Sequence, residues 1–153
     1  MAEAAVKKTV NLILGTMTFG EQIFGNDVNA MIDCFLDHGY KELDTAYVYN
    51  NGECERLLGK ALEKIDRNCY EIASKVNPRI TGRLDKEAVL TQANESLQRL
   101  GIEYMDTLYL HFPDKQTPIE LALEACAQLF DEGKFKKLGL SNFPAWLVEH
   151  MLQ

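Results

Sequence analysis

The feature that most constrains the fold of this chain is a regular alternation of short apolar runs with longer runs of helical periodicity. The short runs predict five β-strands, at residues 10–14, 41–44, 70–75, 105–111 and 137–140. The residues at the ends of these strands, Gly15, Asp44, Lys75, His111 and Ser141, follow one another at intervals of 29, 31, 36 and 30 residues. Units of this length are typical of parallel strands joined by right-handed helical crossovers.

The segments between the strands carry apolar residues at i, i+3, i+4 and i+7, which predicts amphipathic helices. Asn26 or Asp27 is expected to cap the first helix, and Gly39 suits the left-handed residue after it. A capping box starting at Thr117, with Glu120 three residues later, predicts the start of the fourth helix. The helices are expected at about 28–36, 57–65, 85–100 and 118–132, with a fifth from about residue 144, where Trp146 is expected to pack.

An open doubly wound sheet and a (β/α)₈ barrel both satisfy this pattern. No G-x-G-x-x-G follows the first strand. Gly15 and Gly20 have the glycine spacing of a P-loop, but Glu21 and Gln22 stand where a P-loop has Lys and Ser or Thr. Asp44, Lys75, His111 and the pair Ser141-Asn142 instead place polar groups at successive strand ends, which is where barrels carry their chemistry. The sequence therefore predicts an α/β fold of the TIM (β/α)₈ barrel type. A whole barrel takes roughly 250 residues, so we expect five βα units, a partial barrel forming one domain over residues 1–153.

Charge and composition exclude several classes of partner. The chain has 16 basic and 23 acidic residues, a net charge of −7, and no cluster of Lys or Arg. This balance argues against nucleic acid and anionic membranes as partners. No run approaches 18 apolar residues, and the first residues lack the pattern of a secretory leader.

The cysteines and histidines indicate neither disulfides nor metal. The four cysteines stand far apart without a C-x-x-C pair, which favours reduced thiols and a cytoplasmic location. The three histidines show no ligand spacing, so no metal site is expected. These residues are Cys34, Cys54, Cys69 and Cys126, and His38, His111 and His150.

Five ordered segments carry a resemblance to a known family. They are LGTMTFG at 14–20, LDTAYVY at 43–49, IASKV at 72–76, LYLHFPD at 108–114 and KLGLSNF at 137–143. From about Thr9 to Gln153 the chain resembles the aldo-keto reductases. The stretch from residue 117 to 146 is most similar to the aflatoxin-aldehyde and succinic-semialdehyde reductases.

The resemblance implies reduction of aldehydes or ketones to alcohols with NADPH as cofactor and a small carbonyl compound as substrate. By motif, the catalytic residues would be Asp44, Tyr49, Lys75 and His111. Ser141 and Asn142 match positions that bind the nicotinamide carboxamide. The remaining residues implied near the cofactor are Gly15, Thr16 and Met17, together with Asp44.

These residue types suit the reaction that the family implies. Tyr49 would protonate the carbonyl oxygen as hydride arrives, and an adjacent Lys75 ammonium would favour tyrosinate and make the phenol a better acid. Asp44 would pair with Lys75, and a neutral His111 would donate a hydrogen bond to the substrate oxygen. On composition alone Tyr47 is as good an acid as Tyr49, and only the motif selects between them.

Five βα units leave open three alternatives for the chain. In the first, the chain is a fragment of an active reductase. In the second, it is a short non-catalytic chain that acts by pairing with other subunits. In the third, it is a regulatory module resembling channel subunits. An incomplete barrel exposes two sheet edges, which favours homo-oligomers through the open edge. We expect the 153-residue chain by itself to be inactive, because the family's segments for the adenosine and phosphates of the cofactor are absent.

Overall fold

A computed structural model describes residues 10–153 and shows one parallel sheet of five strands. The expected start of the resemblance at Thr9 and the expected absence of a leader concern residues outside this range. The strands lie in the order β1-β2-β3-β4-β5, each beside its neighbour in sequence. Their bounds are β1 Ile13–Gly15, β2 Glu42–Asp44, β3 Glu71–Val76, β4 Met105–Leu110 and β5 Phe135–Leu140.

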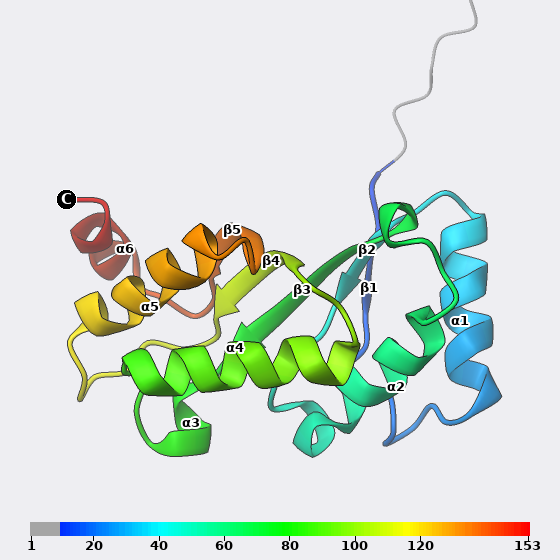
Figure 1. Ribbon diagram of the computed structural model, residues 1–153, viewed down its shortest axis with the longest axis horizontal. Coiled ribbons are helices and arrows are strands. Elements are labelled where there is room, and N and C mark those ends of the chain that lie inside the picture. The colour runs from blue at the N-terminus through cyan, green and yellow to red at the C-terminus, as the bar shows by residue number, and fades with distance from the viewer. Residues whose placement is uncertain (1–9) are drawn as a thin grey trace, which may run out of the picture.

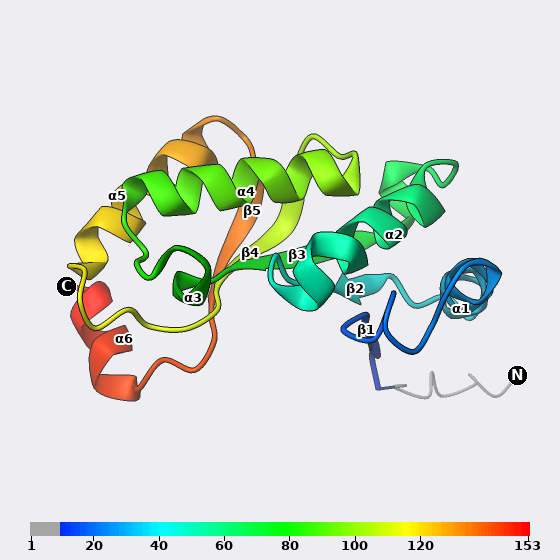
Figure 2. The same cartoon turned by 90° about the horizontal axis from the view of Figure 1, so that it is seen from below.

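Helices follow the strands and lie outside the curved sheet, as Figures 1 and 2 show for α2, α4 and α5. Strand and helix alternate with sequential parallel pairing, so this is a partial (β/α) barrel, as the intervals predict. No helix within residues 10–153 is long and apolar enough to cross a membrane. The helices are α1 Asn26–Asp37, α2 Glu53–Leu62, α3 Pro78–Thr81, α4 Lys86–Leu100, α5 Ile119–Asp131 and α6 Ala145–Met151, with 3₁₀ turns η1 Tyr49–Gly52 and η2 Arg67–Cys69.

Two apolar clusters pack the helices against the outer face of the sheet. In one, Leu43 and Ile72 of β2 and β3 meet residues of α1 and α2. In the other, Leu108 and Leu110 of β4 meet residues of α4 and α5. Ile102 packs against both clusters, so the two form a continuous layer that fixes each strand end relative to its neighbours.

Both capping predictions are wrong in detail. Helix α1 begins at Asn26, and Gly25, with φ of +52°, is its N-cap, so neither Asn26 nor Asp27 caps it. At α5 the N-cap is Pro118, and no side chain caps the helix. The Thr117 hydroxyl instead lies near the Asp114 carboxylate, whose pKa it helps to lower.

Two other local expectations have opposite outcomes. Gly39, the residue after the His38 C-cap of α1, has φ of +85°, which confirms the left-handed turn expected there. Trp146 is 69% exposed, so its expected packing role in α6 is wrong for the residues described. The four cysteines form no disulfide within residues 10–153, and Cys54 and Cys126 are buried.

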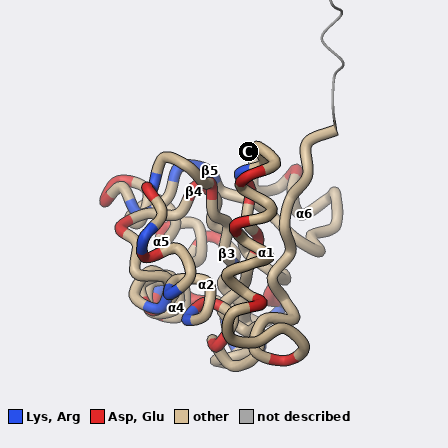
Figure 3. Tube along the Cα trace, turned by 90° about the vertical axis from the view of Figure 1, so that its right-hand side faces the viewer, with Lys and Arg blue, Asp and Glu red and all other residues tan. Residues whose placement is uncertain are grey.

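Charge is unevenly distributed around the sheet. Figure 3 views the molecule from the α1 side, with acidic and basic residues coloured. Residues 21–37, which form the loop before α1 and the helix itself, contain Glu21, Asp27, Asp33 and Asp37 and no Lys or Arg. This flank of the partial barrel is therefore acidic.

Candidate active site

The sheet register gathers the expected residues at one edge. Asp44 ends β2 and Lys75 is the last residue but one of β3, while His111 directly follows β4. Tyr49 starts the turn η1 in the loop after β2. Parallel strands present their carboxyl ends at the same edge of the sheet. Asp44, Lys75 and His111 therefore lie at neighbouring strand ends, and the loop after β2 brings Tyr49 to the same edge.

Lys75 and Asp44 form a partly buried ion pair, as the sequence predicts. The Lys75 Nζ donates to both Asp44 carboxylate oxygens, at 2.8 and 2.7 Å, and to the Thr45 carbonyl at 2.6 Å. These three acceptors use all three ammonium hydrogens. The ammonium also lies 5.3 Å from the ring centre of Tyr49 and 5.8 Å from that of Tyr109. The charge of Lys75 is therefore held in one place, near two aromatic rings.

Tyr49 is half-buried beside this pair, and its pKa shifts in the direction opposite to the one expected. Burial raises the pKa of the Tyr49 phenol, and the Asp44 carboxylate raises it further. The net shift is therefore opposite to the one expected from Lys75 alone, because burial of the phenol and the Asp44 carboxylate both disfavour the phenolate. The structure therefore holds Tyr49 as a neutral phenol at pH 7.

His111 completes the cluster. Its ring stacks on Phe112 with centres 4.8 Å apart and meets the Tyr49 ring edge-on at 6.0 Å. Burial lowers the pKa of His111, and the nearby Lys75 charge lowers it further. The imidazole is therefore neutral at pH 7, in agreement with the expectation.

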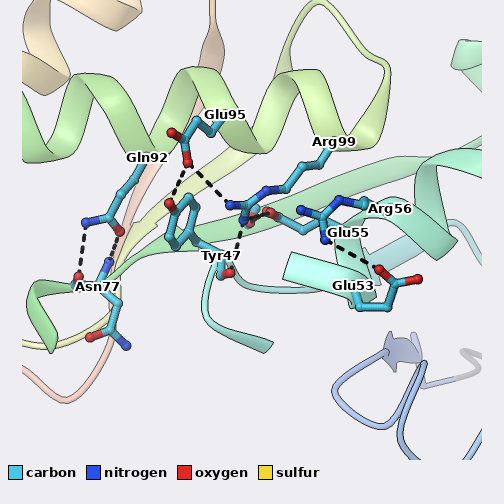
Figure 4. Close-up of polar contacts among 9 residues, drawn as sticks. Tyr47, Glu53, Glu55, Arg56, Asn77, Gln92, Glu95 and Arg99 are labelled. Atoms are coloured by element: carbon cyan, nitrogen blue, oxygen red, sulfur yellow. Dashed lines mark hydrogen bonds and ion pairs between the residues drawn. The ribbon is translucent and has the colours of Figure 1, made fainter. Parts of the chain in front are cut away.

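The structure distinguishes the two tyrosines that composition could not. The Tyr47 hydroxyl donates to Oε2 of Glu95 at 2.5 Å, and the Tyr47 ring lies under the guanidinium of Arg99 at 4.1 Å (Figure 4). Its ring is thus turned toward α4. Only Tyr49 has its ring beside both Lys75 and His111.

A second buried ion pair anchors the loop that carries Tyr49. The Arg99 guanidinium donates to the fully buried Glu55 carboxylate at 3.1 Å and to the Tyr47 carbonyl at 3.3 Å (Figure 4). Ser74 donates to the other Glu55 oxygen at 2.6 Å. Gly52 has φ of +83°, and a Cβ there would lie 2.6 Å from the guanidinium, so only glycine fits this turn.

Donors and acceptors suited to a carboxamide lie at the end of β5. The Asn142 Nδ2 donates to the His111 carbonyl at 2.9 Å and to the Ser141 hydroxyl at 3.0 Å. Ser141 keeps its own hydroxyl hydrogen for donation, and Oδ1 of Asn142 is an acceptor. Asn142 adopts a left-handed backbone with φ of +62°. This donor set fits the amide of a nicotinamide.

The loop after β1 lies beside Asp44 as well. Thr16 is buried, and both its backbone N–H and its hydroxyl donate to the Asp44 carbonyl, at 2.9 and 3.0 Å. Thr16 therefore joins β1 to the end of β2, while Met17 is 58% exposed and a Cβ on Gly15 would meet open space. Within residues 10–153 no group of three or more His, Cys, Asp or Glu is arranged to hold a metal.

Sequence reasoning missed one residue in contact with the cluster. Asn77 is 2% exposed, and its Nδ2 lies 3.2 Å from Nδ1 of His111. The available signal was the Asn77-Pro78 pair after a strand, because Asn at the N-cap and Pro at the first position are typical of a helix start.

Comparison with known proteins agrees with this geometry. The model of the Aldo/keto reductase family matches residues 11–153. Aflatoxin B1 aldehyde reductase member 4 of Homo sapiens is 41% identical over 138 residues, which are 89% of this chain and 42% of that protein. A Schizosaccharomyces pombe protein provisionally named as a voltage-gated potassium channel subunit beta is 33% identical, over 98% of this chain and 46% of its own length.

Solved structures give the same result. An aldo-keto reductase from Klebsiella pneumoniae in complex with NADPH superposes with a TM-score of 0.80 and 29% identity. The match covers 92% of this chain and 48% of the Klebsiella chain. The chain therefore spans a little under half the length of the relatives that it matches.

Proposed function

Since this chain belongs to the aldo/keto reductase family, we propose that it contributes the catalytic residues for NADPH-dependent reduction of small aldehydes or ketones to alcohols. The observation that carries the proposal is the cluster of Asp44, Tyr49, Lys75 and His111 at the carboxyl ends of three adjacent strands. A relative named as an aldehyde reductase and a structural neighbour bound to NADPH support the substrate class and the cofactor.

Tyr49 is the proposed proton donor. A donor must hold its proton until the carbonyl oxygen develops negative charge, and the raised pKa of Tyr49 keeps the phenol protonated at pH 7. When the proton leaves, the phenolate forms beside the Lys75 ammonium, which lies 5.3 Å from the ring centre and favours the anion. Asp44 holds that ammonium in position.

His111 is proposed to orient the carbonyl. A neutral imidazole donates one hydrogen bond, which stabilises charge on the substrate oxygen as it develops. NADPH, when bound, supplies the hydride that reduces the carbonyl carbon. Ser141 and Asn142 are proposed to hold its carboxamide, with Gly15, Thr16 and Met17 beside it and Asp44 at the same edge.

The test compares two tyrosines that lie two residues apart. Tyr49→Phe keeps the ring and removes the acid, so carbonyl reduction by the whole polypeptide that carries this sequence should fall about 10²–10⁴-fold. Binding of NADPH, followed by fluorescence titration, should change little. Tyr47→Phe is the matched control, because the Tyr47 hydroxyl points to Glu95, and this variant should retain most of the turnover.

Two results would contradict the proposal. Near-full turnover in Tyr49→Phe with loss in Tyr47→Phe would transfer the acid role to Tyr47. Failure of the unmodified whole polypeptide to oxidise NADPH with any of a panel of aldehydes and ketones would favour a non-catalytic, regulatory role. The match to the protein named as a channel subunit is the observation that makes this second function the alternative.

A further inference from the structure

Asn77 presents a fixed donor to His111. Asn77 caps α3, and its Oδ1 accepts from the backbone N–H of Arg79 at 2.9 Å. This bond settles which end of the amide is the oxygen, so the group 3.2 Å from Nδ1 of His111 is the NH₂. An amide NH₂ only donates, and the ring nitrogen that faces it must accept.

An accepting Nδ1 places the proton of a neutral imidazole on Nε2. We propose that Asn77 is a positioning residue that holds His111 in the Nε2–H form and so keeps its single N–H on the side away from Asn77, free for the oxygen of a bound carbonyl compound. The role in catalysis rests on the proposed function, whereas the control of the His111 proton does not.

Asn77 is itself held firmly enough to impose this form. Gln92 of α4 is 1% exposed, and its side-chain amide bonds to both backbone groups of Asn77 (Figure 4). The Asn77 N–H donates to Oε1 at 2.8 Å, and the Asn77 carbonyl accepts from Nε2 at 3.1 Å. Phe112 and Tyr49 wall the other sides of the His111 ring.

The charges around His111 make the position of its proton decisive. Lys75 of β3 and Arg79 of α3 disfavour the imidazolium, and Asp44 of β2 favours it. Together with burial, the net effect lowers the pKa of His111. A neutral ring has one N–H only, so a proton on Nδ1 would leave no donor for a substrate at Nε2.

Two substitutions separate this role from the helix cap. Asn77→Asp keeps an oxygen that accepts from the Arg79 N–H. Its second carboxylate oxygen replaces the NH₂ that faces Nδ1 of His111, and because this oxygen can only accept, Nδ1 must carry a proton to hydrogen-bond with it. Asn77→Ser also keeps a good N-cap but is too short to reach the ring. The two variants should therefore fold alike, but only Asn77→Asp requires a proton on Nδ1 of His111.

The first measurement is the ¹⁵N spectrum of the histidine ring nitrogens at pH 7–8, with His111 assigned through a His111→Gln variant. We expect Nδ1 of His111 to be unprotonated in the unmodified protein and protonated in Asn77→Asp. A protonated Nδ1 in the unmodified protein, or an unprotonated one in Asn77→Asp, would overturn the proposal.

The second measurement is carbonyl reduction by the whole polypeptide as a function of pH. Loss of one donor to a developing oxyanion costs about 10²–10³-fold in kcat. Asn77→Asp should lose about 10²-fold at pH 8, with KM changed less, and recover toward low pH as the imidazolium regains an Nε2–H. Asn77→Ser should lose less than Asn77→Asp, and equal losses in the two variants would overturn the positioning role. If the unmodified polypeptide reduces no carbonyl, the proposed function fails while the spectra still decide the position of the proton.

Discussion

Replacing Arg99 by Met tests how strongly the buried ion pair behind the candidate site stabilises the fold. Methionine fills a similar volume of side chain and removes the charge. The change leaves the Glu55 carboxylate, which is fully buried, with the Ser74 hydroxyl as its remaining side-chain partner. It also removes the cation from the Tyr47 ring, 4.1 Å away.

The structure predicts unequal costs for the two partners of the pair. Stranding a buried charge costs about 3–5 kcal/mol, so Arg99→Met should lose that amount of unfolding free energy. Glu55→Gln leaves no buried charge without a partner, because the remaining charge is that of Arg99, which is 17% exposed and still pairs with Glu95 at 3.3 Å. Its cost should be about 1–2 kcal/mol. The double variant should be more stable than Arg99→Met alone, because no unpaired carboxylate remains.

Urea unfolding followed by far-UV circular dichroism at pH 7 measures these differences. Fluorescence is a poorer probe, since Trp146, the only tryptophan, is 69% exposed. At about 2–4 °C per kcal/mol for a domain of roughly 150–250 residues, Arg99→Met should lower Tm by roughly 6–20 °C. A cost for Arg99→Met no greater than that of Glu55→Gln, or additive costs in the double variant, would refute the reasoning.

Two further variants test other contacts. Burial alone would raise the pKa of Asp106, but hydrogen bonds from Arg67 and Lys136 outweigh it and hold the pKa below its usual value. This carboxylate therefore stabilises the fold above its unfolded pKa of about 3.9 and ceases to do so as pH falls through its lower folded value. Asp106→Asn should cost about 1–3 kcal/mol at pH 7, and the difference in urea midpoint should narrow below about pH 4; a constant difference would contradict this. Gly139→Ala would place a Cβ 2.3 Å from the Tyr109 ring, so thermal unfolding should show a loss of about 1–3 kcal/mol in the free energy of unfolding. The loss should be smaller when Tyr109 is also replaced by Leu. An equal loss in that background would show that the ring is not the obstacle.

The sequence predicts the sheet order and the gathering of Asp44, Lys75 and His111, because both follow from local signals. Apolar periodicity identifies each strand and helix, and equal spacing implies parallel crossovers. The carboxyl ends then necessarily meet at one edge. Tyr49 needed the family motif, because it lies in a loop where periodicity gives no direction.

Contacts between distant segments could not be predicted in this way. The hydrogen bond from Asn77 to His111 spans 34 residues, and the ion pair of Glu55 and Arg99 spans 44. Nothing in either local pattern names the partner. The pKa of Tyr49 was predicted in the wrong direction for the same reason, since the sequence places Lys75 nearby but shows neither the burial of the phenol nor the position of the Asp44 carboxylate beside it.

Helix α4 has a consequence for anyone who would transfer this site to another protein. Gln92 holds the residue behind His111, and Arg99, seven positions later and about 10 Å along the helix axis, holds the loop of Tyr49. The distance between the two side chains on which the proposed chemistry depends is thus set through two residues of one helix. A graft that copied only the strand ends and their loops onto a new scaffold would reproduce the residues but lose the distance between His111 and Tyr49. The graft must therefore include helix α4.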